Sequence, residues 1–230
     1  MFIPIHDNTP LRLIRFQFVT GLIFLINVGF FVYTHVLIGG QGEVSIATSL
    51  GAIPALITDN ANLDPALKVV PEPATLITYM FMHAGWLHLI ANMLFLIVFA
   101  DNVEDTFGHV GFLLFYLICG VAAALAHTLA APQSQAPLIG ASGAVSGVLA
   151  AYLVLFPRAR VWVLLFMKLP LRISALWALV GWFAFQVFSL FIEQEGNTVV
   201  AWWAHIGGFV AGLLITLAML KLFRARFAGQ

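Results

Sequence analysis

The chain has 230 residues, of which 62% are hydrophobic and only 9% are charged. A soluble domain usually carries about 25% charged residues, so this composition places most of the chain in a lipid bilayer. The net charge is zero, which argues against nucleic acid as a partner. The single cysteine excludes an internal disulfide and leaves no cysteine-based metal site.

Stretches without charged residues predict six membrane-spanning helices, because a crossing needs roughly 20 apolar residues. The longest stretch, between Asp105 and Arg158, is divided by Pro132 and Pro137. The predicted spans are about 16–38, 85–100, 110–131, 141–157, 173–192 and 200–221. No small-residue cleavage site follows the first apolar run, so we interpret that run as a retained span. The sequence therefore predicts an all-α, polytopic membrane protein with a single domain, residues 1–230.

The distribution of Lys and Arg predicts the orientation of the spans. Most of these residues fall on one face, which the positive-inside rule assigns to the cytoplasm. They are Arg12, Arg15, Arg158, Arg160, Lys168, Arg172, Lys221, Arg224 and Arg226. Asp101, Glu104 and Asp105 would follow the second span on the same face, but acidic residues count little in this rule. We therefore expect a multi-pass membrane protein with both termini in the cytoplasm.

The first outer loop, about 39–84, is long for a connection between helices. Its middle, residues 44–58, is apolar but too short and too polar to span. We expect this stretch to lie in the membrane interface or to dip into the outer leaflet; an ordinary outer loop is the alternative.

Polar residues inside the spans are functional candidates because their burial in a bilayer is costly. Apart from Lys221 at the end of the sixth, the predicted spans contain no Asp, Glu, Lys or Arg, which excludes an aspartyl intramembrane protease, and no His-Glu-x-x-His zinc motif is present. The remaining polar residues are histidines, asparagines, serines and Gln186. His88 and Asn92 share one face of the second span, where interhelical hydrogen bonding is the alternative role. For His83, at the start of that segment, we favour a structural role.

Small residues at a four-residue spacing mark the fourth and sixth spans. Gly143 and Gly147 form such a seam in the fourth span, and Gly208 and Gly212 form another in the sixth. Seams of this kind let two membrane helices approach closely, so we expect these spans to pack together. His205 lies on the same stripe as Gly208 and Gly212.

The candidate residues converge at one depth. Ser142 and His205 each lie about five residues inside the outer end of a span, roughly 8–12 Å below the surface. His88 and Asn92 enter from the same side. A serine needs a base to become a nucleophile, and His205 is the candidate base. With no acid in the spans, this would be a Ser-His dyad. The imidazole ring of His205 would then have to be held by Trp202, Trp203 or the backbone.

Three motifs in order carry a resemblance to a known family. They are His83-Ala-Gly-Trp-Leu-His88-Leu-Ile-Ala-Asn92, Gly140-Ala-Ser142-Gly143, and Ala204-His205-Ile-Gly-Gly208. Over nearly its whole length the chain resembles the rhomboid intramembrane serine proteases of the six-helix bacterial type. The resemblance implies that Ser142 is the nucleophile and His205 the general base. It also implies that His88, Asn92 and the Ser142 backbone N–H stabilise the oxyanion.

The resemblance further implies the partners and the reaction. The expected substrates are single-span membrane proteins, cut near the outer end of their helix at a site that opens to the outer face. Membrane lipid is the other partner, and no cofactor, metal or nucleic acid is expected. The resemblance to the bacterial type also implies a location in a bacterial cytoplasmic (inner) membrane. The alternatives are an inactive relative that acts as a membrane chaperone or binding protein, and a small-solute transporter or channel.

Two positions depart from the family pattern. Ser146 stands where many members have an aromatic residue that stacks on the histidine, and it is a minor rival nucleophile. Val200 stands where many members have a glycine. We also expect the fifth span and the loop 193–199 to move when a substrate enters.

Overall fold

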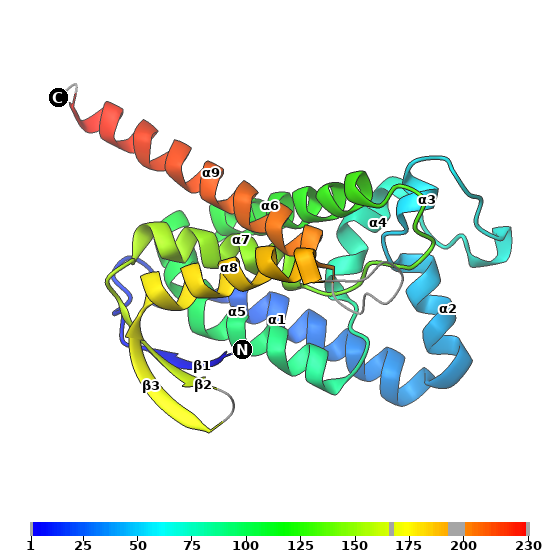
Figure 1. Ribbon diagram of the computed structural model, residues 1–230, viewed down its shortest axis with the longest axis horizontal. Helices are drawn as coiled ribbons and strands as arrows, with labels where there is room; N and C mark the ends of the chain where they lie inside the picture. The colour runs from blue at the N-terminus through cyan, green and yellow to red at the C-terminus, as the bar shows by residue number, and fades with distance from the viewer. Residues whose placement is uncertain (1, 166–167, 193–200, 229–230) are drawn as a thin grey trace.

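The computed structural model describes residues 2–165, 168–192 and 201–228, and most of them form a helical bundle (Figure 1). Its long helices are α1 (Phe18–Phe31) with the π-helical continuation η1 (Val32–Ile38), α5 (Trp86–Phe107), α6 (His109–Ala130), α7 (Ser142–Leu155), α8 (Ala175–Ile192) and α9 (Trp202–Ala228). Within the described residues, five helical segments are long and apolar enough to cross a membrane, and α7 is a shorter apolar helix. The predicted polytopic helical fold is confirmed.

The long first loop folds into short helices at one end of the bundle (Figure 1). They are α2 (Gly40–Leu50), α3 (Pro54–Ile57), η2 (Pro65–Leu67), α4 (Glu72–Thr78) and η3 (Tyr79–Phe81). Between α2 and α3, the backbone of Ala52 exchanges two hydrogen bonds with Leu138, of 2.9 and 3.0 Å. The loop is therefore fixed to the segment that leads into α7. Its position relative to a lipid surface stays a prediction.

A small antiparallel sheet at the other end of the bundle was not predicted from the sequence. It consists of β1 (Phe2–Asp7), β2 (Arg160–Leu165) and β3 (Leu169–Ser174) in the order β1-β2-β3. From Arg160 to Val163, exposed and buried residues alternate. This two-residue period is that of a half-buried strand. A search for 20-residue apolar stretches overlooks so short a pattern. The inner face packs on α5, where Phe2 contacts Phe95 at 5.7 Å between ring centroids.

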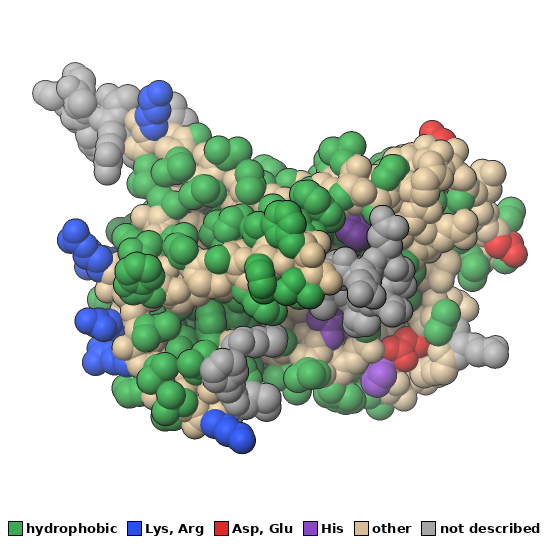
Figure 2. All heavy atoms as spheres, in the orientation of Figure 1, with side chains coloured by type: hydrophobic (Ala, Val, Ile, Leu, Met, Phe, Trp, Pro, Cys, Tyr) green, Lys and Arg blue, Asp and Glu red, His purple; other side chains and the backbone are tan. Residues whose placement is uncertain are grey.

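The two ends of the bundle differ in charge. Figure 2 shows Lys and Arg side chains at the end that carries the sheet, whereas the Asp and Glu side chains visible on this face lie at the opposite end. Arg160 and Arg172 of the sheet are exposed. This separation matches the loop assignment made from the sequence, although which end faces the cytoplasm stays a prediction.

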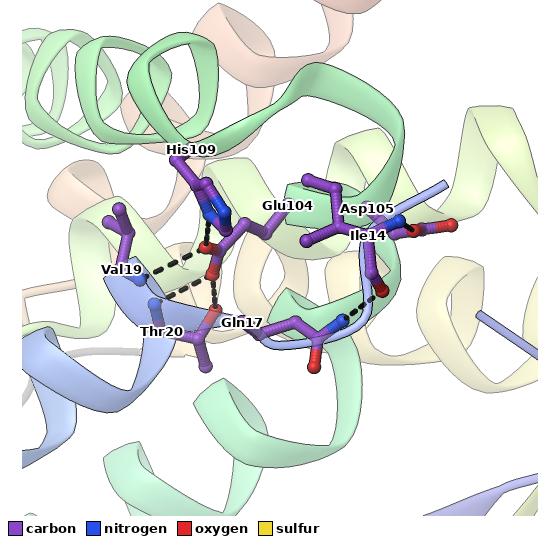
Figure 3. A network of polar contacts seen from close by, with 7 residues as sticks. All are labelled: Ile14, Gln17, Val19, Thr20, Glu104, Asp105 and His109. Atoms are coloured by element: carbon purple, nitrogen blue, oxygen red, sulfur yellow. Dashed lines mark hydrogen bonds and ion pairs between the residues drawn. The ribbon is translucent and has the colours of Figure 1, made fainter. Parts of the chain in front are cut away.

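The acidic residues after the second predicted span are not loop residues, which corrects the sequence interpretation. α5 continues to Phe107, past the predicted end at residue 100, and Glu104 is fully buried at 0% exposure. The Glu104 carboxylate accepts hydrogen bonds from Val19 N (2.9 Å), Thr20 N (2.7 Å) and Thr20 Oγ1 (2.6 Å), and lies 2.5 Å from His109 Nδ1 (Figure 3). Glu104 thus caps α1, whose first amides have no partner within the helix.

Asp105 binds the chain just before α1. Its carboxylate accepts hydrogen bonds from the backbone amides of Arg12 (2.8 Å), Leu13 (2.8 Å) and Ile14 (2.5 Å). The end of α5 therefore continues as helix because its acids satisfy amide groups of the N-terminal segment, which offsets the cost of burying them.

We expect Glu104→Ala to lower the free energy of unfolding by about 2–4 kcal/mol, because it leaves the buried amides of Val19 and Thr20 without an acceptor. Thermal denaturation in detergent micelles measures this loss. The matched control is Glu72→Ala, which removes an exposed carboxylate paired with Lys68 and should leave the transition almost unchanged. Equal shifts in the two variants would contradict the capping role.

Candidate active site

Backbone contacts between α7 and α9 define the centre of the bundle. A side chain added at Gly208 would overlap the carbonyl group of Gly143, and one added at Gly212 would overlap the backbone of Gly147. The two contacts are in the same order along both helices, so the helices run in parallel. The close packing predicted from the glycine seams is confirmed.

α6 also packs against α7 at this contact. A side chain at Gly147 would collide with Cys119 of α6, and one at Gly143 would collide with Ala123. Cys119 and Ala123 are both fully buried. Small residues on all three helices therefore hold α7 in one position.

The seam brings the two main candidate residues together. Ser142 is the first residue of α7, and His205 lies in the first turn of α9. The distance between Ser142 Oγ and His205 Nε2 is 2.8 Å, within hydrogen-bonding range. This contact joins residues 63 positions apart in the sequence. Their catalytic roles stay predictions.

Ser146, the rival nucleophile, is engaged elsewhere. Its hydroxyl donates a 2.6 Å hydrogen bond to the carbonyl oxygen of Ser142, and its side chain is 1% exposed. A serine that bonds back into its own helix in this way has no base at its hydroxyl.

His88 lies beside the segment that leads to Ser142. Gly140 has a φ of +121° and donates its N–H to the carbonyl of Tyr79 at 2.9 Å. A Cβ at Gly140 would lie 2.7 Å from His88 Nε2 and 3.8 Å from Ser142 Oγ. The imidazole and the hydroxyl therefore border the same small space, which only a glycine leaves open. His88 Nδ1 receives a 3.3 Å hydrogen bond from Ala84 N, so Nε2 is the atom left to face the site.

Asn92 and His83 support this histidine. Asn92 is buried, and its amide donates a 2.8 Å hydrogen bond to the carbonyl oxygen of His88 within α5. The His83 ring packs edge-on against His88 with 5.0 Å between centroids, and neither of its ring nitrogens has a partner among the described residues. The structure thus brings His88 to Ser142, whereas the contact it gives Asn92 is local, and the oxyanion role of Asn92 stays a prediction.

The surroundings of His205 include a residue to which the sequence assigned no role. Nδ1 of His205 lies 2.8 Å from Oε1 of Gln186, which α8 supplies and which is 4% exposed. Trp182 and Trp202 flank the ring at 6.0 and 6.1 Å between centroids. Trp203, also considered as a support, is 46% exposed. The only sequence signal for Gln186 was that it is a polar residue within a span that lacks charged residues.

The site carries no formal charge of its own. Its groups are a hydroxyl, imidazoles, carboxamides and the backbone amides at the start of α7, where no side chain caps the helix. In the part of the chain that the structure describes, no group of three or more His, Cys, Asp or Glu side chains is placed to hold a metal ion. The predicted cap loop 193–199 and Val200 lie outside the described residues.

Comparison with known proteins adds the family context. A model of the rhomboid domain matches residues 71–222, which include every residue of the site. The chain is 30% identical over 145 residues to RHOMBOID-like protein 5 of Arabidopsis thaliana, covering 63% of this chain and 43% of that protein. It is 27% identical over 152 residues to Putative rhomboid protease YdcA of Bacillus subtilis, covering 66% and 70%. It is 31% identical over 154 residues to Rhomboid-like protease 5 of Toxoplasma gondii, covering 64% and 16%. The matched region is thus less than half of the plant protein.

Gly208→Ala should lower the free energy of unfolding by about 1–3 kcal/mol, because the new methyl group would overlap the backbone of α7 and force the helices apart. Gly181→Ala is the matched control, since nothing lies within 4 Å of the added carbon and alanine favours a helix. Thermal unfolding of both variants in the same detergent checks the difference. A Gly208→Ala protein as stable as Gly181→Ala would refute the close contact.

Proposed function

The chain belongs to the rhomboid family of multi-pass membrane proteins, and we propose that it is a serine-type intramembrane endopeptidase. The observation that carries the proposal is the 2.8 Å contact between Ser142 Oγ and His205 Nε2 in the first turns of two membrane helices. Two of the matched relatives, from Bacillus subtilis and Toxoplasma gondii, carry the word protease in their names, which supports the same reaction.

The proposed first step is acylation of Ser142. Its oxygen attacks the carbonyl carbon of the scissile peptide while the hydroxyl proton passes to Nε2 of His205. The tetrahedral intermediate collapses when the C–N bond breaks and His205 returns the proton to the leaving amine. Water then attacks the acyl-enzyme, with His205 again accepting and returning a proton, so that the carboxylic acid is released and Ser142 regains its hydroxyl.

The groups near Ser142 suit the charge that develops on the carbonyl oxygen. The backbone N–H groups of the first turn of α7 have no partner within the helix, and the helix dipole favours negative charge there. We assign the Ser142 N–H, His88 and Asn92 as donors to this oxyanion. Donors fixed before the reaction need no reorganisation at the transition state, which is the basis of their catalytic effect.

The length of α7 supports a substrate that lies in the membrane. The 14 residues of this helix span about 21 Å, less than the roughly 30 Å hydrocarbon layer. We propose that Ser142, at one end of this helix, is recessed below the lipid surface on its side. We propose that single-span membrane proteins are cut near the end of their helix on that side, opposite the basic end of the bundle. By the positive-inside rule that side is the outer face.

A fluorophosphonate probe tests the proposal. Wild-type protein in detergent should be labelled, Ser142→Ala should lose at least about 99% of the labelling, and Ser146→Ala should retain most of it, because its hydroxyl is bonded to the backbone. In-gel fluorescence with folded, monodisperse protein measures all three. Absence of labelling in the wild type would favour an inactive membrane chaperone or binding protein, and labelling that depends on Ser146 would reassign the nucleophile.

A further inference from the structure

We propose that Gln186 of α8 is the positioning residue of the site: it fixes the tautomer of His205 that lets Nε2 accept the Ser142 proton. The inference rests on the proposed function and extends the dyad to a third residue. Its geometric basis is the pair of contacts on one imidazole, 2.8 Å from Nδ1 to Gln186 Oε1 and 2.8 Å from Nε2 to Ser142 Oγ.

The chemistry of the amide oxygen decides the direction of both hydrogen bonds. Oε1 of Gln186 carries no proton and can only accept, so His205 Nδ1 must donate. In a neutral imidazole the other nitrogen then has no hydrogen and accepts. Nε2 is therefore the acceptor that faces Ser142. Without Gln186 the ring would be free to adopt the other tautomer, in which Nε2 carries the hydrogen and is no base.

A neutral amide suits this position in a membrane. In soluble serine proteases a buried aspartate holds the histidine in the same way. A carboxylate at membrane depth carries a large desolvation cost, whereas a carboxamide supplies the acceptor without a charge. Within α8, Gln186 is the only polar residue among those that are buried, and the others are apolar and lie in the first two turns.

The placement of Gln186 couples the site to α8. This helix packs beside the start of α9 (Figure 1). Beyond the first two turns of α8, the contacts are the one from Gln186 to His205 and aromatic pairs, among them Phe183 with Phe209 at 4.2 Å between ring centroids. Phe185, Phe188 and Phe191 of α8 are exposed. If α8 moves away from α9 during substrate entry, the hydrogen bond to His205 breaks with it. The tautomer in which Nε2 accepts is then fixed only while α8 is docked.

The experiment compares Gln186→Met, which keeps the length but removes the acceptor, with Gln186→Glu, which keeps an acceptor. For cleavage of a single-span membrane substrate, Gln186→Met should lower kcat at least about tenfold with little change in KM. Gln186→Glu should retain most of the activity at alkaline pH and lose it on acidification, when the carboxyl group gains a proton and can donate. Ser189→Ala, which changes a half-buried serine whose hydroxyl bonds to the backbone of the same helix, is the control and should match the wild type.

A direct readout of the tautomer accompanies the kinetics. In ¹⁵N-histidine-labelled protein, His205 should show the Nδ1–H tautomer in the wild type and a mixture of tautomers in Gln186→Met. Unchanged kcat and tautomer in Gln186→Met would overturn the inference. So would equal losses in the Met and Glu variants at every pH, because these indicate a structural role.

The outcomes also separate this inference from the proposed function. Wild-type labelling that is lost in Ser142→Ala, together with a fully active Gln186→Met, overturns only the role of Gln186. Wild-type protein that neither reacts with the fluorophosphonate nor cleaves a substrate overturns both. If Gln186→Met does not fold, the pH dependence of Gln186→Glu decides: a profile identical to that of the wild type contradicts the proposal.

Discussion

The structure depends on one contact, the backbone-to-backbone approach of α7 and α9 at Gly143 and Gly208. Apolar surface drives little association between helices in lipid, so close packing and hydrogen bonds must hold them together. Glycines allow both, because the helices approach to the distance at which a serine on one reaches a histidine on the other. The residues that pack the helices and the residues proposed to react are neighbours in sequence for this reason.

The elements around that contact fix the remaining parts of the site. The loop before α7 is tied to Ala52 and Tyr79 by backbone hydrogen bonds, which sets the path of Gly140 and the space for His88. α8 contributes Gln186 from the other side. None of these side chains is a carboxylate or an ammonium group, so the proposed reactive centre lies inside the membrane without burying either.

The sequence predicted what local spacing and composition encode. Glycines four residues apart, with a serine and a histidine beside them, predicted the packing of two spans and the pair at their ends. It could not predict contacts that depend on distant segments. The strand Phe2–Asp7 is stable only when paired with Arg160–Leu165, and Glu104 is buried only because α1 presents its amides. The proposed role of Gln186 likewise depends on its contact with His205, which arises only from the packing of α8 against α9.

The most direct test of the account is the reactivity of a thiol at position 142. Cys119, the only natural cysteine, is fully buried, so Ser142→Cys introduces a single accessible thiol. If His205 lies beside it, the ion pair favours the thiolate, and alkylation by iodoacetamide at pH 6 should be at least about tenfold faster than in the Ser142→Cys/His205→Ala double variant. Equal rates in the two proteins would contradict the contact on which the proposed function is built.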